Sequence, residues 1–221
     1  MSYIEFLTEH GSRLLSGAIV TAEQTVLAAI LAVAIAIVMG LMRLSRYFAV
    51  RATATCYIEL FRGTSLLVQL YWIFFVLPLF GITLEKFTAG IVAVGMNLGG
   101  YGAEVVRGAI QAVPRGQYEA ALALNMTPLT RMRRIIFPQA ILIMLPAWGN
   151  LMIELLKGTA LVALISVSDL MFEAKQINGS TFLSVEAFGS ALIIYYVMAR
   201  VFISPSMRWF ERFTARKMGR A

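Results

Sequence analysis

Long apolar stretches with almost no charge constrain the fold of this chain more than any other feature. Five are long enough to cross a bilayer, which takes a helix of about 20 residues: residues 14–41, 53–80, 88–112, 135–167 and 185–204. Membrane β-strands would instead alternate apolar and polar residues over about 10 positions. Hydrophobic residues make up 59% of the 221 residues and charged residues 14%, so a soluble globule would expose much apolar surface. The sequence therefore predicts an all-α integral membrane fold of about five transmembrane helices, in a single domain over residues 1–221 with a core at about 14–212.

The charged residues between these stretches predict how the chain is oriented. Lys and Arg concentrate in one set of alternate connections, which holds Arg43, Arg46, Arg51, Arg107, Arg115, Arg131, Arg133, Arg134, Arg208, Arg212, Arg216, Lys217 and Arg220. The opposite set mixes both signs and holds Glu5, Glu9, Arg13, Glu85, Lys86, Asp169, Glu173, Lys175 and Glu186. The positive-inside rule then places the N-terminus outside and the C-terminus in the cytoplasm, in agreement with an odd number of spans.

Several kinds of chemistry lack the residues that they need. The chain has no GxxxxGK[ST] loop for binding the phosphates of ATP. Its single histidine, His10, and its single cysteine, Cys56, leave no metal-binding or His-based catalytic cluster, so we expect no catalytic residue, no metal and no cofactor. A net charge of +7 would suggest nucleic acid as the partner of a soluble chain. Here the positive residues follow the membrane topology, so we expect a lipid bilayer around the chain and no nucleic acid.

The most informative connection lies at about residues 113–134, on the predicted cytoplasmic side. From Gly116 onward the chain reads GQYEAALALNMTPLTRMRRIIFP. Residues 117–124 are rich in Ala and Leu and predict a short helix, which Asn125 can end in a left-handed conformation. Thr127 and Pro128 suit the N-cap and the first position of a second helix. The sequence predicts a small helical knob outside the membrane; the alternative is a surface loop that merely joins two spans.

This segment resembles the EAA loop of permease subunits of bacterial ATP-binding-cassette (ABC) importers. The family pattern is EAA, three residues, Gly, nine residues and I-x-L-P; here Glu119-Ala120-Ala121 precedes Asn125, and Ile135-Ile136-Phe137-Pro138 follows. The two departures are mild, because Asn tolerates the left-handed conformation and Phe in place of Leu keeps an apolar contact. Three further segments resemble the polar amino-acid uptake branch of the family: ELFRGTSLLVQL at 59–70, EVVRG at 104–108 and LKGTALVALI at 156–165.

The resemblance implies a five-helix permease core in the bacterial cytoplasmic (inner) membrane. It also implies a second permease subunit, two cytoplasmic ABC ATPase subunits that hydrolyse ATP, and an extracytoplasmic solute-binding protein, so that this chain itself is not an enzyme. The residues that would couple it to a cleft in the ATPase are Gly116, Glu119, Ala120, Ala121, Asn125 and Pro138. The cargo would be a polar amino acid or a related zwitterion such as an opine.

Ionisable residues inside the spans are costly and usually face the protein interior or a water-filled path. Three acid–base pairs have i,i+3 spacing, which places both partners on one helical face: Glu59 with Arg62, Glu104 with Arg107, and Glu154 with Lys157. Counted from the predicted outer ends, Gln69, Asn97 and Glu154 lie near the bilayer midplane, roughly 15 Å deep.

We therefore expect two polar layers in the membrane. The upper layer would hold substrate and contains Gln69, Asn97, Glu154 and Lys157. The lower layer would close the path on the cytoplasmic side and contains Glu59, Arg62, Glu104 and Arg107. The alternative is that the acid–base pairs only hold helices together.

Three shorter patterns predict local structure. Gly95 and Gly99 form a GxxxG match, which favours close helix packing, either inside the chain or at a subunit interface. Residues 157–159 read Lys-Gly-Thr and predict an interruption of the long fourth stretch. Asn178-Gly179 is typical of a turn.

Two other classes of function remain open at this point. A stand-alone secondary transporter driven by ions could use the carboxylates in the membrane, although the EAA-type loop would then have no purpose. A membrane enzyme or a structural subunit is the third class, and the lack of a nucleophile, metal cluster or phosphate loop disfavours an enzyme.

Overall fold

A computed structural model of the chain describes residues 3–217. Within that range every regular element is a helix. Helices Tyr3–Arg43, Lys86–Gln111, Pro128–Ile165 and Ser184–Arg216 are long and apolar enough to cross a membrane, and the bent pair Phe48–Gly63 and Leu66–Phe80 is a fifth candidate. The predicted all-α membrane fold of about five spans is confirmed.

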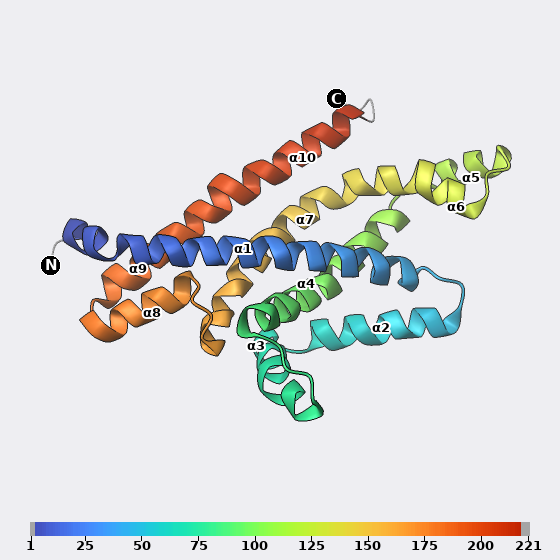
Figure 1. Cartoon of the computed structure of the whole chain (residues 1–221). Helices are drawn as coiled ribbons and strands as arrows, with labels where there is room; N and C mark the ends of the chain where they lie inside the picture. Colours follow the sequence, from blue (N-terminus) through green and yellow to red (C-terminus); the bar gives the residue numbers. More distant parts are fainter. Residues whose placement is uncertain (1–2, 218–221) are drawn as a thin grey trace.

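Two long helices form the centre of the molecule (Figure 1). α1 (Tyr3–Arg43) runs along most of its length, and α4 (Lys86–Gln111) packs against it more extensively than any other described pair of elements. α7 (Phe137–Thr159) packs on α4, and α2 (Phe48–Gly63) packs on both α1 and α4. This arrangement leaves one face of α7 beside α4 and the segment that follows α2, where several polar residues of the spans lie.

The two ends of the molecule differ (Figure 1). The N-terminus lies at one end together with α8 (Leu170–Thr181). The short helices α5 (Arg115–Ala123) and α6 (Pro128–Arg131) project at the other end. We call α5, α6 and the turn between them the knob.

Small residues let α1 and α4 approach closely. Four of them recur every four positions on the buried face of α1, namely Ala28, Ala32, Ala36 and Gly40. On α4, a Cβ atom added to Gly95 would lie 2.8 Å from Leu31 Cδ2, and one added to Gly99 would lie 2.7 Å from Ile35 Cγ2. The GxxxG pattern therefore serves a helix contact inside the chain and not a subunit interface.

The second predicted span, expected as a continuous stretch at 53–80, is broken. α2 ends at Gly63, α3 (Leu66–Tyr71) begins two residues after Thr64, and the two halves of the span meet at a bend of 106°. Thr64 and Ser65 have extended backbones, with ψ of 156° and 133°. The apolar character of both halves conceals this break in the sequence.

After α3 the chain keeps a helical path but changes its hydrogen-bond pattern. A π-helical segment, η1 (Trp72–Val76), is followed by a 3₁₀ segment, η2 (Leu77–Phe80). Gly81 then ends the helix with φ of 83°, a conformation that costs glycine nothing.

The fourth span also changes helix type at both ends. It starts with α6 and a π-helical segment, η3 (Met132–Ile136), continues as α7, and ends as a 3₁₀ segment, η4 (Ala160–Ile165). The predicted interruption at 157–159 lies where α7 gives way to η4. Ser166 closes the segment with φ of 61°.

A buried carboxylate starts α8 at the end of the molecule that holds the N-terminus. Asp169 accepts a hydrogen bond from the N–H of Phe172 at 2.9 Å and from the hydroxyl of Tyr195 at 3.3 Å. Burial raises the pKa of Asp169 to about 6.

The predicted turn at Asn178-Gly179 is wrong, because both residues lie inside α8. Leu170, Ala174 and Ile177 of this helix are buried in a cluster with α1 and α9.

The last span is one long helix with a local change of pitch. α9 (Ser184–Val197) passes through a π-helical segment, η5 (Met198–Ile203), into α10 (Ser204–Lys217).

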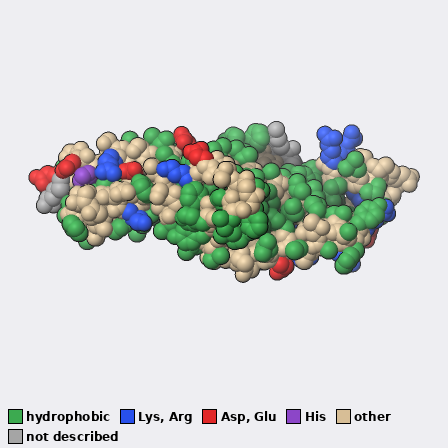
Figure 2. Space-filling view, turned by 60° about the horizontal axis from the view of Figure 1, so that its bottom comes forward, with side chains coloured by type: hydrophobic (Ala, Val, Ile, Leu, Met, Phe, Trp, Pro, Cys, Tyr) green, Lys and Arg blue, Asp and Glu red, His purple; other side chains and the backbone are tan. Residues whose placement is uncertain are grey.

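Figure 2 shows hydrophobic side chains over the middle of the molecule, with most of the visible Lys and Arg toward its ends. That distribution is expected of a protein surrounded by lipid.

The close packing of α1, α4 and α7 leads to a test with two glycines of one helix. A Cβ atom on Gly102 would lie 2.7 Å from Trp148 Cη2 and 2.8 Å from Ala36 Cβ, whereas nothing lies within 4 Å of one on Gly108. We expect Gly102→Ala to destabilise the protein by about 1–3 kcal/mol through overpacking. Gly108→Ala should be neutral or stabilising by up to about 1 kcal/mol, because alanine favours the helix. Thermal unfolding in detergent measures both, and equal melting temperatures would contradict the packing.

Candidate functional site

The knob is held in shape by a left-handed turn at the end of α5. Asn125 has φ of 51°, as predicted. The N–H of Met126 donates to the carbonyl of Ala121 at 3.0 Å, and the N–H of Asn125 donates to that of Leu122 at 2.9 Å. These two bonds are the Schellman pattern, which satisfies carbonyls that a helix end leaves unpaired. Asn125 thus fixes where α5 stops and in which direction the chain leaves it.

The second half of the knob also follows its predicted capping. Thr127 is the N-cap of α6, where its Oγ1 accepts a hydrogen bond from the N–H of Thr130 at 3.4 Å, and Pro128 is the first helical residue. The knob is tied to the spans by Gln139 Nε2, which donates to Gln117 Oε1 at 3.0 Å. It therefore has a defined structure and is more than a simple connection between spans.

One of the predicted coupling residues is buried within the chain. Ala121 is 2% exposed, because it lies on the face of α5 that packs inside the chain. Its small side chain packs under the knob, so its contribution to coupling would be to hold the exposed face in place. Pro138 is likewise half-buried, in the first turn of α7. The exposed face instead carries Gly116, Glu119, Ala120, Leu122, Leu124, Asn125 and Leu129.

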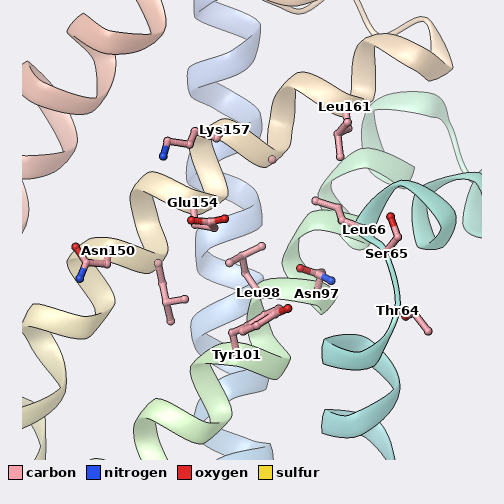
Figure 3. A pocket seen from close by; sticks show the side chains of 12 residues that line it. Thr64, Ser65, Leu66, Asn97, Leu98, Tyr101, Asn150, Glu154, Lys157 and Leu161 are labelled. Atoms are coloured by element: carbon pink, nitrogen blue, oxygen red, sulfur yellow. The ribbon is translucent and has the colours of Figure 1, made fainter.

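A polar cavity of about 700 Å³ lies between the break of the second span, α4 and α7. Its lining is formed by Thr64, Ser65, Leu66, Asn97, Leu98, Tyr101, Asn150, Leu151, Glu154, Lys157, Gly158 and Leu161. Figure 3 shows how the residues from these three parts of the chain surround the space. Three of the four predicted substrate-path residues, Asn97, Glu154 and Lys157, are thus brought together.

One face of α7 supplies the charged groups of the polar cavity. Asn150, Glu154 and Lys157 follow i, i+4, i+7 spacing and are all exposed in the isolated chain. Among the described ion pairs none joins Glu154 to Lys157. In Figure 3 the Lys157 side chain points away from the part of the cavity that holds Asn97. The carboxylate and the ammonium group are therefore both available to a solute.

The fourth predicted path residue, Gln69, lies behind the cavity wall. Its Nε2 donates to the carbonyl of Phe61 at 3.0 Å and to Thr64 Oγ1 at 2.7 Å. Asn97 Nδ2 donates to the same Phe61 carbonyl at 3.0 Å and to Gln69 Oε1 at 3.0 Å. We call this pair the amide clamp. The clamp donates hydrogen bonds to backbone and side-chain oxygens at the broken helix, so Gln69 has a structural role. Asn97 belongs both to the clamp and to the cavity lining.

The predicted lower layer is divided between two places. Arg107 Nη2 lies 2.7 Å from Glu104 Oε2, and Arg43 Nε of α1 lies 3.5 Å from Glu104 Oε1. Arg43 also donates to Thr55 of α2 at 2.5 Å. This cluster joins α1, α2 and α4, which favours the interpretation that it holds helices together.

The other pair of the lower layer is not an ion pair. The Arg62 guanidinium lies 5.4 Å from the centre of the Tyr101 ring, and no described ion pair joins it to Glu59. Both side chains are exposed, and Tyr101 connects Arg62 to the polar cavity. Of the predicted layer, Arg62 is the residue that the structure places next to the polar cavity, through its contact with Tyr101.

The sequence analysis did not assign Thr64, Ser65, Tyr101 and Asn150 to the cavity lining, and it did not pair Arg43 with Glu104. Asn150 stands four residues before Glu154, and this i,i+4 spacing could have indicated it. Tyr101 and Arg43 carried no such signal, because their partners are distant in sequence. Within the described residues no group of three or more His, Cys, Asp or Glu side chains is placed to hold a metal.

Comparison with known proteins identifies the family. Residues 18–216 match the model of the binding-protein-dependent transport system inner membrane component. The chain belongs to this permease family. It is 42% identical to a probable amino-acid ABC transporter permease protein, y4tF, of Sinorhizobium fredii, over 92% of this chain and 87% of that protein. It is also 37% identical to the L-cystine transport system permease protein TcyB of Bacillus subtilis, over 75% and 71% of the two chains.

Solved structures of two ABC transporters have the same fold. A crystal structure of an amino acid ABC transporter with histidines matches with a TM-score of 0.87 and 38% identity, covering 96% of this chain and 98% of that one. The MetNI methionine ABC transporter in an inward-facing conformation matches with a TM-score of 0.80 at 19% identity, over 91% and 96% of the chains, and supports the fold alone.

The left-handed turn of the knob gives a prediction for this permease. Asn125→Gly should keep the turn and the function of the knob, because glycine adopts positive φ freely. Asn125→Val should distort it, at a cost of about 1–3 kcal/mol, because a β-branched side chain is strained there. ATP-dependent uptake by the reconstituted transporter measures the difference. Equal uptake by the two variants would show that the turn does not matter.

The amide clamp gives a second prediction. Asn97→Leu leaves Gln69 Oε1 without its donor, so we expect a loss of about 1–3 kcal/mol in stability. The control is Gln176→Leu, which also replaces an amide side chain by leucine, but at an exposed position on α8. It should have little effect on stability. Thermal unfolding in detergent compares them, and similar melting temperatures would remove the clamp as a structural element.

Proposed function

We propose that this permease carries a polar amino acid, or a related zwitterion, across the bacterial inner membrane through the polar cavity. The observation that supports it is the presence of a carboxylate and an ammonium group on one exposed face of α7. The relatives named for amino-acid and L-cystine transport point to the same class of cargo.

The chemistry of the polar cavity suits a zwitterion. Both N–H groups of Asn97 are used in the amide clamp, so its Oδ1 is the atom left to accept a hydrogen bond from a solute. Together with the Glu154 carboxylate it can receive an ammonium group. Lys157 can attract a carboxylate.

A second permease subunit would close the cavity. Glu154, Lys157 and Asn150 are exposed in the isolated chain, although charges in a membrane must be shielded from lipid. An apolar surface hollow beside the cavity, lined by Val68, Tyr71, Trp72, Phe75, Val76 and Leu164, can pack on that subunit. The transport path would then run between two permeases.

The knob would couple the path to a separate ATPase. Its exposed leucines Leu122, Leu124 and Leu129 are 57%, 74% and 77% exposed, and they suit a cleft in a partner. ATP would be hydrolysed in that partner, so this chain is not an enzyme. An extracytoplasmic solute-binding protein would deliver the cargo, with the N-terminus outside and the knob in the cytoplasm.

Removal of the carboxylate from the polar cavity tests this function. In proteoliposomes that hold the complete transporter, Glu154→Gln should lower uptake at least about tenfold, equivalent to about 1.4 kcal/mol. Glu85→Gln, which removes an exposed carboxylate outside the spans, is the control and should leave uptake unchanged. Uptake should also stop when the partner ATPase is inactivated; uptake that persists would indicate an ion-driven transporter.

A double variant separates transport from structural pairing. Glu154→Gln with Lys157→Met removes both charges, so that no single charge is left uncompensated. Normal abundance without uptake would support the proposed role of the pair. Normal abundance with full uptake would refute it.

A further inference from the structure

The helix α10 carries a stripe of three arginines. Arg208, Arg212 and Arg216 are exposed and follow i, i+4, i+8 spacing, so they lie along one side of the helix. Arg208 Nε donates to the carbonyl of Ser204 at 3.3 Å. Within residues 3–217 no ion pair joins any of the three to a carboxylate.

Aromatic side chains stand beside this stripe. Trp209 and Phe213, 58% and 42% exposed, lie next to the arginines, whereas Phe210, 50% exposed, lies nearer to the side that carries Met207. The rings of Trp209 and Phe213 stack with centroids 5.3 Å apart. The opposite side of α10 packs on α7, where Met207 joins the buried cluster that contains Trp148. An exposed face that is both aromatic and basic therefore looks away from the protein.

The length of the last span places this face at the membrane surface. The continuous helix Ser184–Arg216 has 33 residues and is about 50 Å long at about 1.5 Å per residue. The hydrocarbon core is only about 30 Å thick, so the final 13 residues or so, which make up α10, reach the interface. The contact of Met207 with the cluster of Trp148, Met144 and Ala140 places α10 in the half of the molecule that leads to the knob (Figure 1).

We propose that α10 is a binding surface for anionic lipid headgroups in the leaflet on the knob side. Tryptophan and phenylalanine enter the boundary between headgroups and acyl chains, and arginines attract the phosphates of anionic lipids. Lipid is favoured over a protein partner because the aromatic face continues from Val201 and Phe202 of η5, apolar residues of the span that are 58% and 63% exposed. Under the orientation in the proposed function, this leaflet is the cytoplasmic one.

The test uses the complete transporter in nanodiscs. Tryptophan fluorescence is quenched with brominated phosphatidylglycerol or with brominated phosphatidylcholine at the same mole fraction. The contribution of Trp209 is the difference between the quenching of the wild type and that of the Trp209→Phe variant. We expect phosphatidylglycerol to quench Trp209 at least about threefold more strongly than phosphatidylcholine, and the ratio to fall toward one at high salt, which screens surface charge.

Matched variants decide whether the arginines are responsible. The triple variant Arg208→Gln, Arg212→Gln, Arg216→Gln should bring the ratio to about one, whereas Arg→Lys at the same three positions should preserve it because the charge remains. A wild-type ratio of one, or an unchanged ratio in the Gln variant, would overturn the proposal. Absence of quenching of Trp209 by both lipids would show that a protein subunit covers α10, and would overturn it too.

The outcome is separable from that of the proposed function. Both leaflets of a nanodisc have the same composition, so the quenching ratio does not depend on orientation or on transport. Substrate-stimulated ATP hydrolysis is measured on the same samples. If Glu154→Gln loses substrate-stimulated ATP hydrolysis but keeps the wild-type quenching ratio, the defect lies in the polar cavity and the lipid-binding proposal is unaffected.

Discussion

The amide clamp between Gln69 and Asn97 is the interaction on which the site depends. A helix that breaks inside a membrane exposes carbonyls, and no water is available in lipid to pair with them. The clamp supplies donors to the carbonyl of Phe61 and to the hydroxyl of Thr64. The second span can therefore bend by 106° and open space beside α7. The polar cavity exists because this break is satisfied from within the chain.

The clamp needs a rigid support, which α1 and α4 provide. Their small residues bring the two backbones close together, so Asn97 stands on a helix that is closely packed along its length. α7 packs on the other side of α4 and presents its charged face to the same space. The packing of α1 on α4 thus fixes the position of Asn97, and a separate helix, α7, carries the charged groups, Glu154 and Lys157, that can contact a solute.

Local sequence signals predicted the knob well, because its turn and caps depend on single residues. Asn125, Thr127 and Pro128 have their predicted conformations, as each rule involves only neighbours in the chain. Which side of α5 faces inward depended on packing against distant segments, and the burial of Ala121 was therefore not foreseen. The same reason explains the Asn178-Gly179 turn that is absent, since tertiary packing of α8 overrides a local preference.

The membrane spans were predictable from hydropathy, but their internal geometry was not. Gln69 and Asn97 were both identified as polar groups at one depth, yet their mutual hydrogen bond depends on a break that apolar residues conceal. Glu104 was assigned to a pair with Arg107, and its second partner, Arg43, comes from another helix. Spacing along one helix can indicate which residues share a face, but it cannot show what the face meets.

The π-helical segment η5 has a consequence for changes in chain length. A π segment contains one residue more than the α-helical turn that it replaces. Deletion of one residue from 198–203 can therefore restore a regular α-helix while the faces of α9 and α10 keep their directions. The same deletion within 204–217 would rotate everything after it by about 100°, and would turn the residues that follow Met207 away from their present neighbours. A change of one residue in the length of this span can thus be accommodated at η5 but not within α10.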